Sequence, residues 1–221
     1  MATRQLLNEL LALYAAHGGC AMQLESVGGV DAAKRVQAGE DFDLVFLASD
    51  AIDKLVDAGH LDATSKVNLA DSGVAIAVRA GAPKPDVATA EAVRATVLAA
   101  RSISYSTGPS GVALAKLFEA WGIVDQIKDR IVTALPGVPV GTLVAKGEVE
   151  LGFQQLSELI HLPGIDLLGN LPDAIQITTT FSAAIGKASA HKPEARALLV
   201  YLTSDQAAAA IRRQGMEPAR Q

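Results

Sequence analysis

Three hydroxyl side chains and two glycines stand together in the stretch from residue 105 to residue 111. The hydroxyls belong to Ser106, Thr107 and Ser110, and the glycines are Gly108 and Gly111. Hydroxyl groups and the unpaired backbone N–H groups at the start of a helix both donate hydrogen bonds to anions. Turns and helix caps use the same residue types, which is the alternative interpretation. The pattern favours an anion site, with Ser110 as its principal contact.

Two further turns have a similar character. Ser26 and Gly28 precede a predicted helix and could present a hydroxyl and a backbone N–H to the same anion, although an ordinary turn would have this composition too. The turn at 136–141 offers the backbone N–H groups around Val138, and a purely structural loop is the alternative there. Each turn would add donors from another part of the chain.

Other side chains extend the candidate set. Gln154 and Gln155 follow a short apolar run, and an amide at a strand end can donate to an oxyanion without carrying charge. Arg4 could clamp a carboxylate, or it is a solvated helix residue. Tyr105 is either a hydrogen-bond donor to the ligand or an aromatic side chain of the hydrophobic core. The predicted ligand contacts are Arg4, Ser26, Gly28, Ser106, Thr107, Ser110, Gly111, Val138 and Gln155.

Patterns typical of other chemistries are missing from this sequence. It contains neither G-x-G-x-x-G nor G-x-x-x-x-G-K-[ST], which disfavours a nucleotide site, and no G-x-S-x-G elbow. Cys20 stands alone and begins a predicted strand, where we expect a buried and inert thiol. The four histidines are scattered without the spacing of a metal site. We therefore expect no cofactor and no metal.

Charge and hydropathy narrow the range of partners. The chain of 221 residues is 50% hydrophobic and carries a net charge of -5. It has no Lys/Arg-rich run, so the sequence gives no sign of a basic surface that would bind nucleic acid. No apolar run approaches the roughly 20 residues that span a bilayer, so we expect a soluble protein. The first residues have neither the basic region nor the apolar run of an export signal.

Helical and strand patterns alternate along the chain. Apolar residues at helical spacing predict helices at 3–17, 29–37, 51–58, 89–98, 110–121, 139–146, 194–202 and 205–214. Short apolar or β-branched runs predict strands at 21–27, 43–47, 74–78, 102–105, 131–134, 151–153 and 175–180. This alternation is typical of an α/β protein whose parallel sheet is covered on both faces.

The stiff segment Gly81–Pro85 indicates a boundary between two lobes. We predict that residues 1–80 and 173–221 form lobe I and that residues 81–172 form lobe II. A chain that leaves one lobe and returns to it is typical of proteins that close around a ligand by hinge motion. Two tandem domains joined by a single linker are the alternative.

Several stretches carry a resemblance to known proteins. They are residues 25–29, 43–49, 53–59, 105–122 and 146–153. Through them the sequence resembles the periplasmic molybdate-binding proteins, within the wider class of extracellular solute-binding proteins, over nearly its whole length. The resemblance implies a two-lobed periplasmic-binding-protein (type II) fold with a hinge and a central cleft.

The resemblance also assigns expected roles. In that family hydroxyls and backbone amides of both lobes hold a tetrahedral oxyanion, which places Ser26 and Ser110 at two such positions and the turn around Val138 near a third. The pair Gln154 and Gln155 stands where molybdate binders usually carry a tyrosine. The family's first strand, which precedes its first helix, has no counterpart in this sequence.

The function that the resemblance implies is capture of a small oxyanion or organic acid for the membrane subunits of an ABC transporter. We expect a periplasmic monomer. The branch that the sequence resembles also includes aconitate isomerase, an enzyme on the same scaffold that moves an allylic proton in a tricarboxylate. The alternative is therefore a cofactor-free isomerase of an unsaturated carboxylic acid, in which Tyr105 would shuttle the proton.

Overall fold

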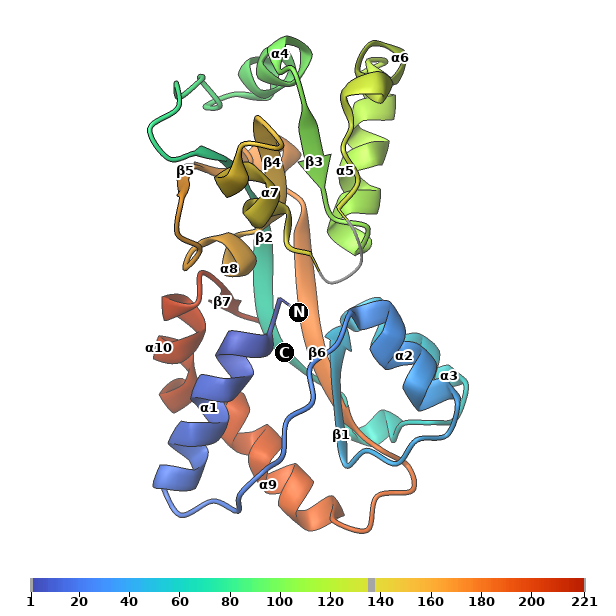
Figure 1. Cartoon of the computed structure of the whole chain (residues 1–221). Helices are drawn as coiled ribbons and strands as arrows, with labels where there is room; N and C mark the ends of the chain where they lie inside the picture. Colours follow the sequence, from blue (N-terminus) through green and yellow to red (C-terminus); the bar gives the residue numbers. More distant parts are fainter. Residues whose placement is uncertain (1, 135–137, 221) are drawn as a thin grey trace. The chain divides into compact units, whose positions relative to one another are not determined.

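The protein is an α/β protein whose chain divides into two compact units (Figure 1). The computed structural model describes residues 2–134 and 138–220. Unit 1 comprises residues 1–72 and 179–221, and unit 2 comprises residues 73–178. Strands β2 (Val67–Arg79) and β6 (Thr178–Ile185) each begin in one unit and end in the other.

Unit 1 consists of two helical layers with strands between them. Its elements are α1 (Arg4–Ala16), α2 (Gly29–Gln37), β1 (Leu44–Ala48), α3 (Ser49–Asp57), the 3-10 turn Ala63–Ser65, α9 (Lys192–Leu202), α10 (Asp205–Arg213) and β7 (Glu217–Pro218). In β1, alternate side chains pack into two different clusters. Leu44 and Phe46 contact the cluster of α1, α9 and α10, whereas Val45 and Leu47 contact the cluster of α2 and α3. This alternation is the period of two expected for a strand.

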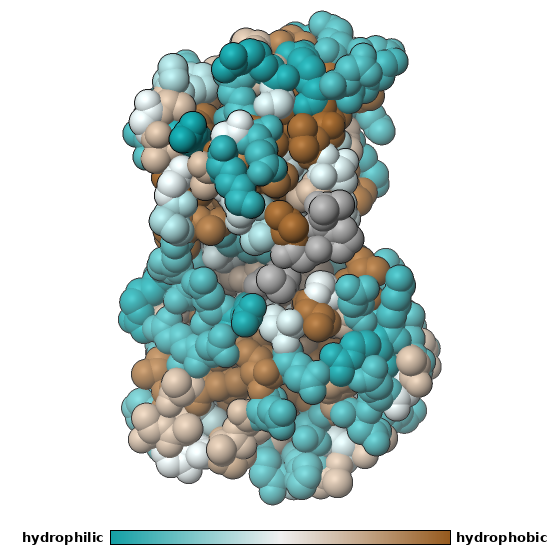
Figure 2. Space-filling view, in the orientation of Figure 1, coloured by the Kyte–Doolittle hydropathy of each residue, from teal (hydrophilic) through white to brown (hydrophobic). Residues whose placement is uncertain are grey.

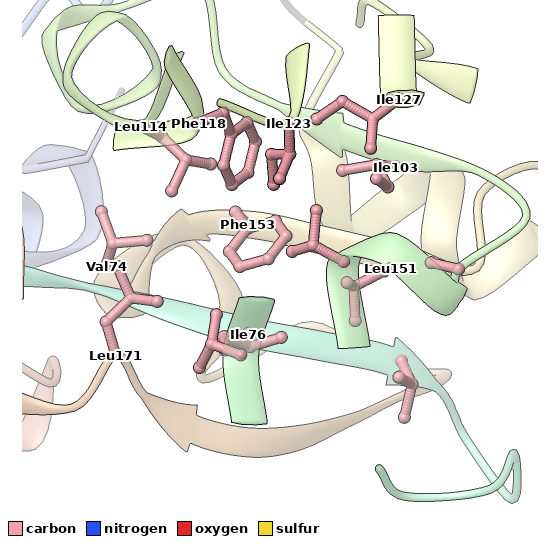
Figure 3. Close-up of a cluster of buried hydrophobic side chains, with 14 residues drawn as sticks. Val74, Ile76, Ile103, Leu114, Phe118, Ile123, Ile127, Leu151, Phe153 and Leu171 are labelled. Atoms are coloured by element: carbon pink, nitrogen blue, oxygen red, sulfur yellow. The ribbon is translucent and has the colours of Figure 1, made fainter. Parts of the chain in front are cut away.

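Unit 2 is built around a sheet that is covered on both faces. Its elements are α4 (Ala90–Ala99), β3 (Ile103–Tyr105), α5 (Pro109–Ala120), α6 (Val124–Ile127), α7 (Val140–Lys146), β4 (Leu151–Gln155), α8 (Leu156–Leu159) and β5 (Ile165–Asn170), with 3-10 turns at Lys128–Arg130 and Asp173–Ile175. The larger core cluster lies between the sheet and α4, α5 and α6 (Figure 3). At its centre the rings of Phe118 and Phe153 meet edge to face, with centroids 6.1 Å apart. Full burial of such a side chain contributes about 1.5–3 kcal/mol to stability.

The strand pairing corrects the predicted parallel sheet. Strand β3 pairs with β4 in parallel, but β1 pairs with β6, and β2 pairs with β4, β5 and β7, in antiparallel fashion. The alternation of strands and helices had suggested that each strand is followed by a helical crossover to a neighbouring parallel strand. Because the two long strands β2 and β6 pair with strands of opposite direction, the prediction of an all-parallel sheet was wrong, while the α/β class is confirmed.

Two predicted strands are not regular strands. Residues 21–27 have no regular secondary structure, and of residues 131–134 only Ile131 forms a bridge, to Ile103. Helices predicted at 3–17, 29–37 and 110–121 occur at Arg4–Ala16, Gly29–Gln37 and Pro109–Ala120. Helix periodicity is a local property, whereas a strand also requires a partner that the pattern does not identify.

The division between the units falls inside β2 and β6, not at the stiff segment Gly81–Pro85. That segment is bound within unit 2, because the Gly81 N–H donates to Asp166 Oδ2 at 3.2 Å and Lys84 pairs with the same carboxylate. Proline and glycine therefore mark the loop that follows β2. The lobes predicted to meet at residues 80/81 and 172/173 differ from the observed units, which meet at 72/73 and 178/179.

The visible surface is mostly hydrophilic, with apolar residues in small groups (Figure 2). The large exposed apolar side chains are Val27, Val30, Val112, Val124 and Val200, which come from separate parts of the sequence. In the part of the chain that the structure describes, no helix is long and apolar enough to cross a membrane.

Candidate functional site

The loop between β3 and α5 gathers most of the predicted contacts of unit 2. Ser106 Oγ and Ser110 Oγ lie 3.1 Å apart and share a hydrogen bond. Helix α5 begins at Pro109, with Gly108 at the N-cap position and no side chain capping the first turn. Ser110 is 5% exposed, Ser106 is half-buried and Thr107 is exposed. The loop therefore places two hydroxyls beside the uncapped backbone N–H groups of a helix of 12 residues.

Gly111 allows this loop to fold back onto the helix. A Cβ atom added at Gly111 would lie 1.5 Å from the carbonyl oxygen of Ser106, a distance at which no side chain fits. Only glycine permits such a close approach of two backbone segments. The predicted contact Gly111 thus has a structural reason to be glycine, because it holds Ser106 against the first turn of α5.

The parallel pairing of β3 and β4 brings a second polar group to the same edge of the sheet. Tyr105 stands beside Phe153 in the register, so the residues that follow both strands emerge at one edge. Gln155 ends β4 there and is 4% exposed. Gln154 is also buried, and its Oε1 accepts the backbone N–H of Gly141 at 3.3 Å. Gln154 therefore stabilises the start of α7.

Glu158 is a polar residue at this edge that the sequence analysis missed. It lies in α8, directly after β4, and is half-buried. Burial raises the pKa of the Glu158 carboxyl, and a hydrogen bond from Gln154 partly opposes this rise. The neighbouring Ser157 Oγ is buried and has no hydrogen-bond partner among the residues that the structure describes. A single acidic residue in a helix of four residues leaves no pattern by which a sequence could reveal it.

Tyr105 belongs mainly to the core. Its ring meets Phe118 edge to face, with centroids 5.9 Å apart, and it packs against the cluster shown in Figure 3. Burial, followed by the negative charge of Glu119, raises the pKa of the Tyr105 phenol. A phenol that holds its proton more tightly is a weaker acid and is less often ionised to the phenolate that would accept a proton, so the structure favours the core role over the predicted proton shuttle.

In unit 1, Ser26 and Gly28 lie directly before α2, with Gly28 at the N-cap position. Ser26 is half-buried, and the turn is anchored by an ion pair between Glu25 Oε2 and Arg35 Nη1 at 2.9 Å. Arg35 also binds Glu40 and stacks over the ring of Phe42. The salt bridge thus connects the turn to the helix that follows it.

The remaining predicted contacts are more scattered. Arg4 is exposed at the first position of α1, in a first turn without acidic residues. Val138 is half-buried and packs against the cluster that includes Val140 and Val144. The rest of its turn, at 135–137, lies outside the described residues. Cys20 is exposed, which corrects the expectation of a buried thiol, because residues 21–27 do not form the strand that would have covered it.

Metal ligands do not gather in the described ranges 2–134 and 138–220, where no group of three or more His, Cys, Asp or Glu side chains could hold an ion. The polar side chains that follow β3 and β4 are hydroxyls, amides and one carboxyl. Such a set can donate hydrogen bonds to an anion, and the carboxyl can exchange a proton.

Comparisons with known proteins agree with this architecture. The sequence model of the bacterial extracellular solute-binding protein family matches residues 1–217. An aconitate isomerase from Pseudomonas sp. is 43% identical over 184 residues, which cover 83% of this chain and 70% of that protein. The periplasmic molybdate-binding protein of Azotobacter vinelandii has a TM-score of 0.82 at 21% identity, over 99% of this chain and 96% of that one.

A second solved structure is also similar. The substrate-binding domain of a candidate molybdenum ABC transporter from Clostridium difficile has a TM-score of 0.78 at 14% identity, over 99% of this chain and 96% of that one. Identities this low carry information on the fold alone. The chain has the α/β fold of the two-lobed periplasmic binding proteins, and it belongs to the bacterial extracellular solute-binding protein family.

Proposed function

We propose that the protein binds a small organic acid or oxyanion through the β3–α5 loop of unit 2. The observation that carries this proposal is the pair of hydroxyls of Ser106 and Ser110 at the uncapped start of α5. One hydroxyl proton is used within the pair, so the other is available to a ligand. The partial positive charge at the start of a helix favours a negatively charged ligand over a neutral one.

The buried hydroxyl of Ser157 supports a polar occupant at the same edge of the sheet. A buried donor without a partner costs about 1–3 kcal/mol, and a hydrogen bond to a ligand would offset this cost. Gln155 and Thr107 would add donors in unit 2. In unit 2, Val138 would also contribute its backbone N–H. The contacts predicted in unit 1, which are Arg4, Ser26 and Gly28, stay predictions.

We further propose an organic acid, of the di- or tricarboxylate class, in preference to molybdate. The relative that is 43% identical is an aconitate isomerase, whereas the molybdate-binding structure shares 21% identity. Carboxylates spread over several carbon atoms match the hydroxyl and amide donors that follow β3 and β4. As a member of an extracellular family, the protein would act in the periplasm and deliver its ligand to an ABC transporter.

The experiment is a binding screen by isothermal titration calorimetry and thermal shift. The ligands are molybdate, tungstate, sulfate, phosphate, citrate, cis-aconitate and trans-aconitate. A ligand at 100 times its Kd adds about 2.7 kcal/mol to the stability of the folded state, which a thermal shift detects easily. We expect stabilisation by the tricarboxylates. Stabilisation by molybdate and tungstate alone would contradict the proposal of an organic acid and leave the proposal of an anion site standing. No stabilisation by any of these ligands would contradict both proposals.

A second function, isomerisation of aconitate, is favoured specifically by the 43% identical relative. Such a reaction removes a proton from the CH2 carbon and returns one to the far carbon of the allylic system, so the double bond moves and no oxidant is needed. Glu158 fits the role of the base better than Tyr105 does, because burial raises the pKa of its carboxyl and so makes the carboxylate a stronger base. Proton NMR in D2O after incubation with trans-aconitate would detect both the cis isomer and deuterium incorporation.

A further inference from the structure

Unit 1 contains a cavity of about 300 Å³ that the proposed function does not use. The cavity lies where three parts of the chain meet, which are the loop between α2 and β1, the turn after α3 and the turn after β6. All of its lining residues fall within 36–45, 59–61 and 186–188. Ligand pockets in proteins begin at about this volume, so the cavity has room for one small molecule.

Part of the cavity wall is apolar. Val36, Val45 and Leu61 line it, are at most 6% exposed and belong to the hydrophobic cluster of α2 and α3. The half-buried ring of Phe42 lines it too and packs against the same cluster. An apolar group that enters the cavity therefore meets hydrophobic side chains, and the loss of its contact with water favours binding.

Polar side chains of both signs line the same cavity. Glu40 and Asp41 follow α2 and provide two carboxylates, and His60 and Lys187 follow α3 and β6 and provide an imidazole and an ammonium group. Glu40 is held by two hydrogen bonds from Arg35, at 2.8 and 2.6 Å. By contrast, no hydrogen bond or ion pair joins the side chain of Asp41, His60 or Lys187 to another residue that the structure describes. These three groups are available to a ligand.

The helix ends at the cavity add to its charge pattern. Helices α2 and α3 lie side by side, and the residues that follow their C-caps, Gly39 and Gly59, both line the cavity (Figure 1). The C-terminal end of a helix carries a partial negative charge of about half an elementary charge. Together with Asp41, the two helix ends favour an ammonium group beside them, whereas Lys187 favours a carboxylate at the end of β6.

The backbone around the cavity is held in place by hydrogen bonds. The Lys187 N–H donates to the carbonyl oxygen of His60 at 2.9 Å, and the Gly186 N–H donates to the carbonyl oxygen of Asp43 at 3.0 Å. Leu61 also forms a bridge with Gly186. Because these bonds connect the three parts of the chain that form the cavity, a ligand would bind with little loss of backbone freedom.

We propose that this cavity is a second ligand site of the protein and that it binds a small apolar α-amino acid as a zwitterion. The apolar side chain of the ligand would contact Val36, Val45 and Leu61. Its ammonium group would pair with Asp41, and its carboxylate would pair with Lys187 and accept a hydrogen bond from the His60 ring. A simple carboxylic acid or a simple amine would leave one of the two charged groups without a partner.

The test is a titration of the whole isotope-labelled chain, followed by the backbone amide signals in NMR. The compounds are leucine, isocaproate, which lacks the amino group, isoamylamine, which lacks the carboxylate, and glycine, which lacks the side chain. We expect leucine to shift the amides of 39–42, 59–61 and 186–188 with a Kd of about 1 mM or lower, and the other compounds to bind at least about fivefold more weakly.

Three results of this titration would overturn the proposal. The first is the absence of any leucine-induced shift, and the second is a set of shifts in the β3–α5 loop in place of the cavity. The third is binding of isocaproate or isoamylamine as tight as that of leucine, because the two charges of the zwitterion would then not both be recognised.

Two substitutions of exposed residues test the two ends of the ligand separately. Lys187→Gln should weaken leucine and isocaproate by about fivefold or more and leave isoamylamine unchanged, whereas Asp41→Asn should weaken leucine and isoamylamine and leave isocaproate unchanged. The matched control is Lys34→Gln, which removes an exposed lysine of α2 outside the cavity and should change none of the affinities. Unchanged leucine binding in Lys187→Gln and Asp41→Asn, or equal losses in Lys187→Gln and Lys34→Gln, would overturn the assignment.

Discussion

The hydroxyl oxygens of Ser106 and Ser110 lie 3.1 Å apart, across the turn that joins β3 to α5. This hydrogen bond orders the loop and orients the second hydroxyl proton away from the pair. Both consequences depend on Ser110, which is buried in the first turn of the helix. A ligand that binds here would therefore meet a donor that is already oriented, and little conformational entropy would be lost when it binds.

Replacing Ser110 by Ala should weaken ligand binding by about 10- to 100-fold, since hydrogen bonds to charged groups contribute about 1.5–3 kcal/mol. Titration calorimetry with the ligand found in the binding screen measures the change. The control is Ser189→Ala, which removes a hydroxyl bonded to Asp43 in unit 1. An unchanged Kd in Ser110→Ala would refute its role as a contact.

The substitution Gly111→Ala should destabilise unit 2 by about 2–4 kcal/mol, because its Cβ would overlap the carbonyl oxygen of Ser106 and force the loop away from the helix. Urea denaturation gives the change in the free energy of unfolding. Gly108→Ala is a matched control in the same loop, where the nearest atom is 3.9 Å from the added Cβ and φ is -80°. Similar losses in the two variants would contradict the proposed close contact.

Arg35→Gln should raise the Kd of the ligand several-fold with little change in overall stability. It removes the ion pair that anchors Glu25, the residue before Ser26. The two carboxylates that Arg35 pairs with are exposed, and ion pairs with exposed carboxylates contribute little to stability. Lys54→Gln, which removes an exposed pair with Asp50 on α3, serves as the control. If both variants bind as tightly as the original chain, the turn at Ser26 does not take part in binding.

If the protein isomerises aconitate, Glu158→Gln should reduce the rate by at least about 100-fold while binding persists, because the amide cannot accept the proton. Tyr105→Phe should retain most of the rate, since the ring packs against Phe118 in both forms. NMR gives the rates and calorimetry gives the Kd. The opposite result, a slow Tyr105→Phe and a fast Glu158→Gln, would restore the tyrosine as the proton carrier.

The stability of unit 2 should fall as pH rises above about 4.5, the ordinary value for the pKa of a glutamate. Burial raises the pKa of Glu158 in the folded state, so the folded state holds this proton more tightly than the unfolded state does. The stabilisation is complete below the unfolded pKa and is lost as pH rises through the folded pKa. Thermal unfolding as a function of pH should show this decline in the original chain and a smaller one in Glu158→Gln.

Much of the helical structure follows from local sequence patterns. Leucines at helical spacing and the glycines after His17 defined α1, and the hydroxyl and glycine pattern correctly located the loop before α5. The placement of Ser106 and Ser110 was predictable because turn chemistry depends on neighbouring residues. Their participation in binding remains a prediction.

The features that the sequence did not reveal depend on distant partners. Strand β5 was missed because its pattern is interrupted by Gly169, whose φ of 125° requires glycine. The direction of pairing of β2 and β6, the core contact of Tyr105 and the burial of Glu158 all arise from residues far away in the chain. Such contacts follow from tertiary packing, which outweighs local preference.

The contact between Gly111 and the Ser106 carbonyl also bears on how this protein could evolve. A position at which a Cβ atom would overlap a neighbouring carbonyl oxygen accepts only glycine, so a change in any ligand specificity of this loop cannot begin there. Thr107 is exposed one residue after Ser106 and meets no such restriction. Descendants that acquire a new specificity should therefore diverge at 107 while inheriting the glycine at 111 unchanged.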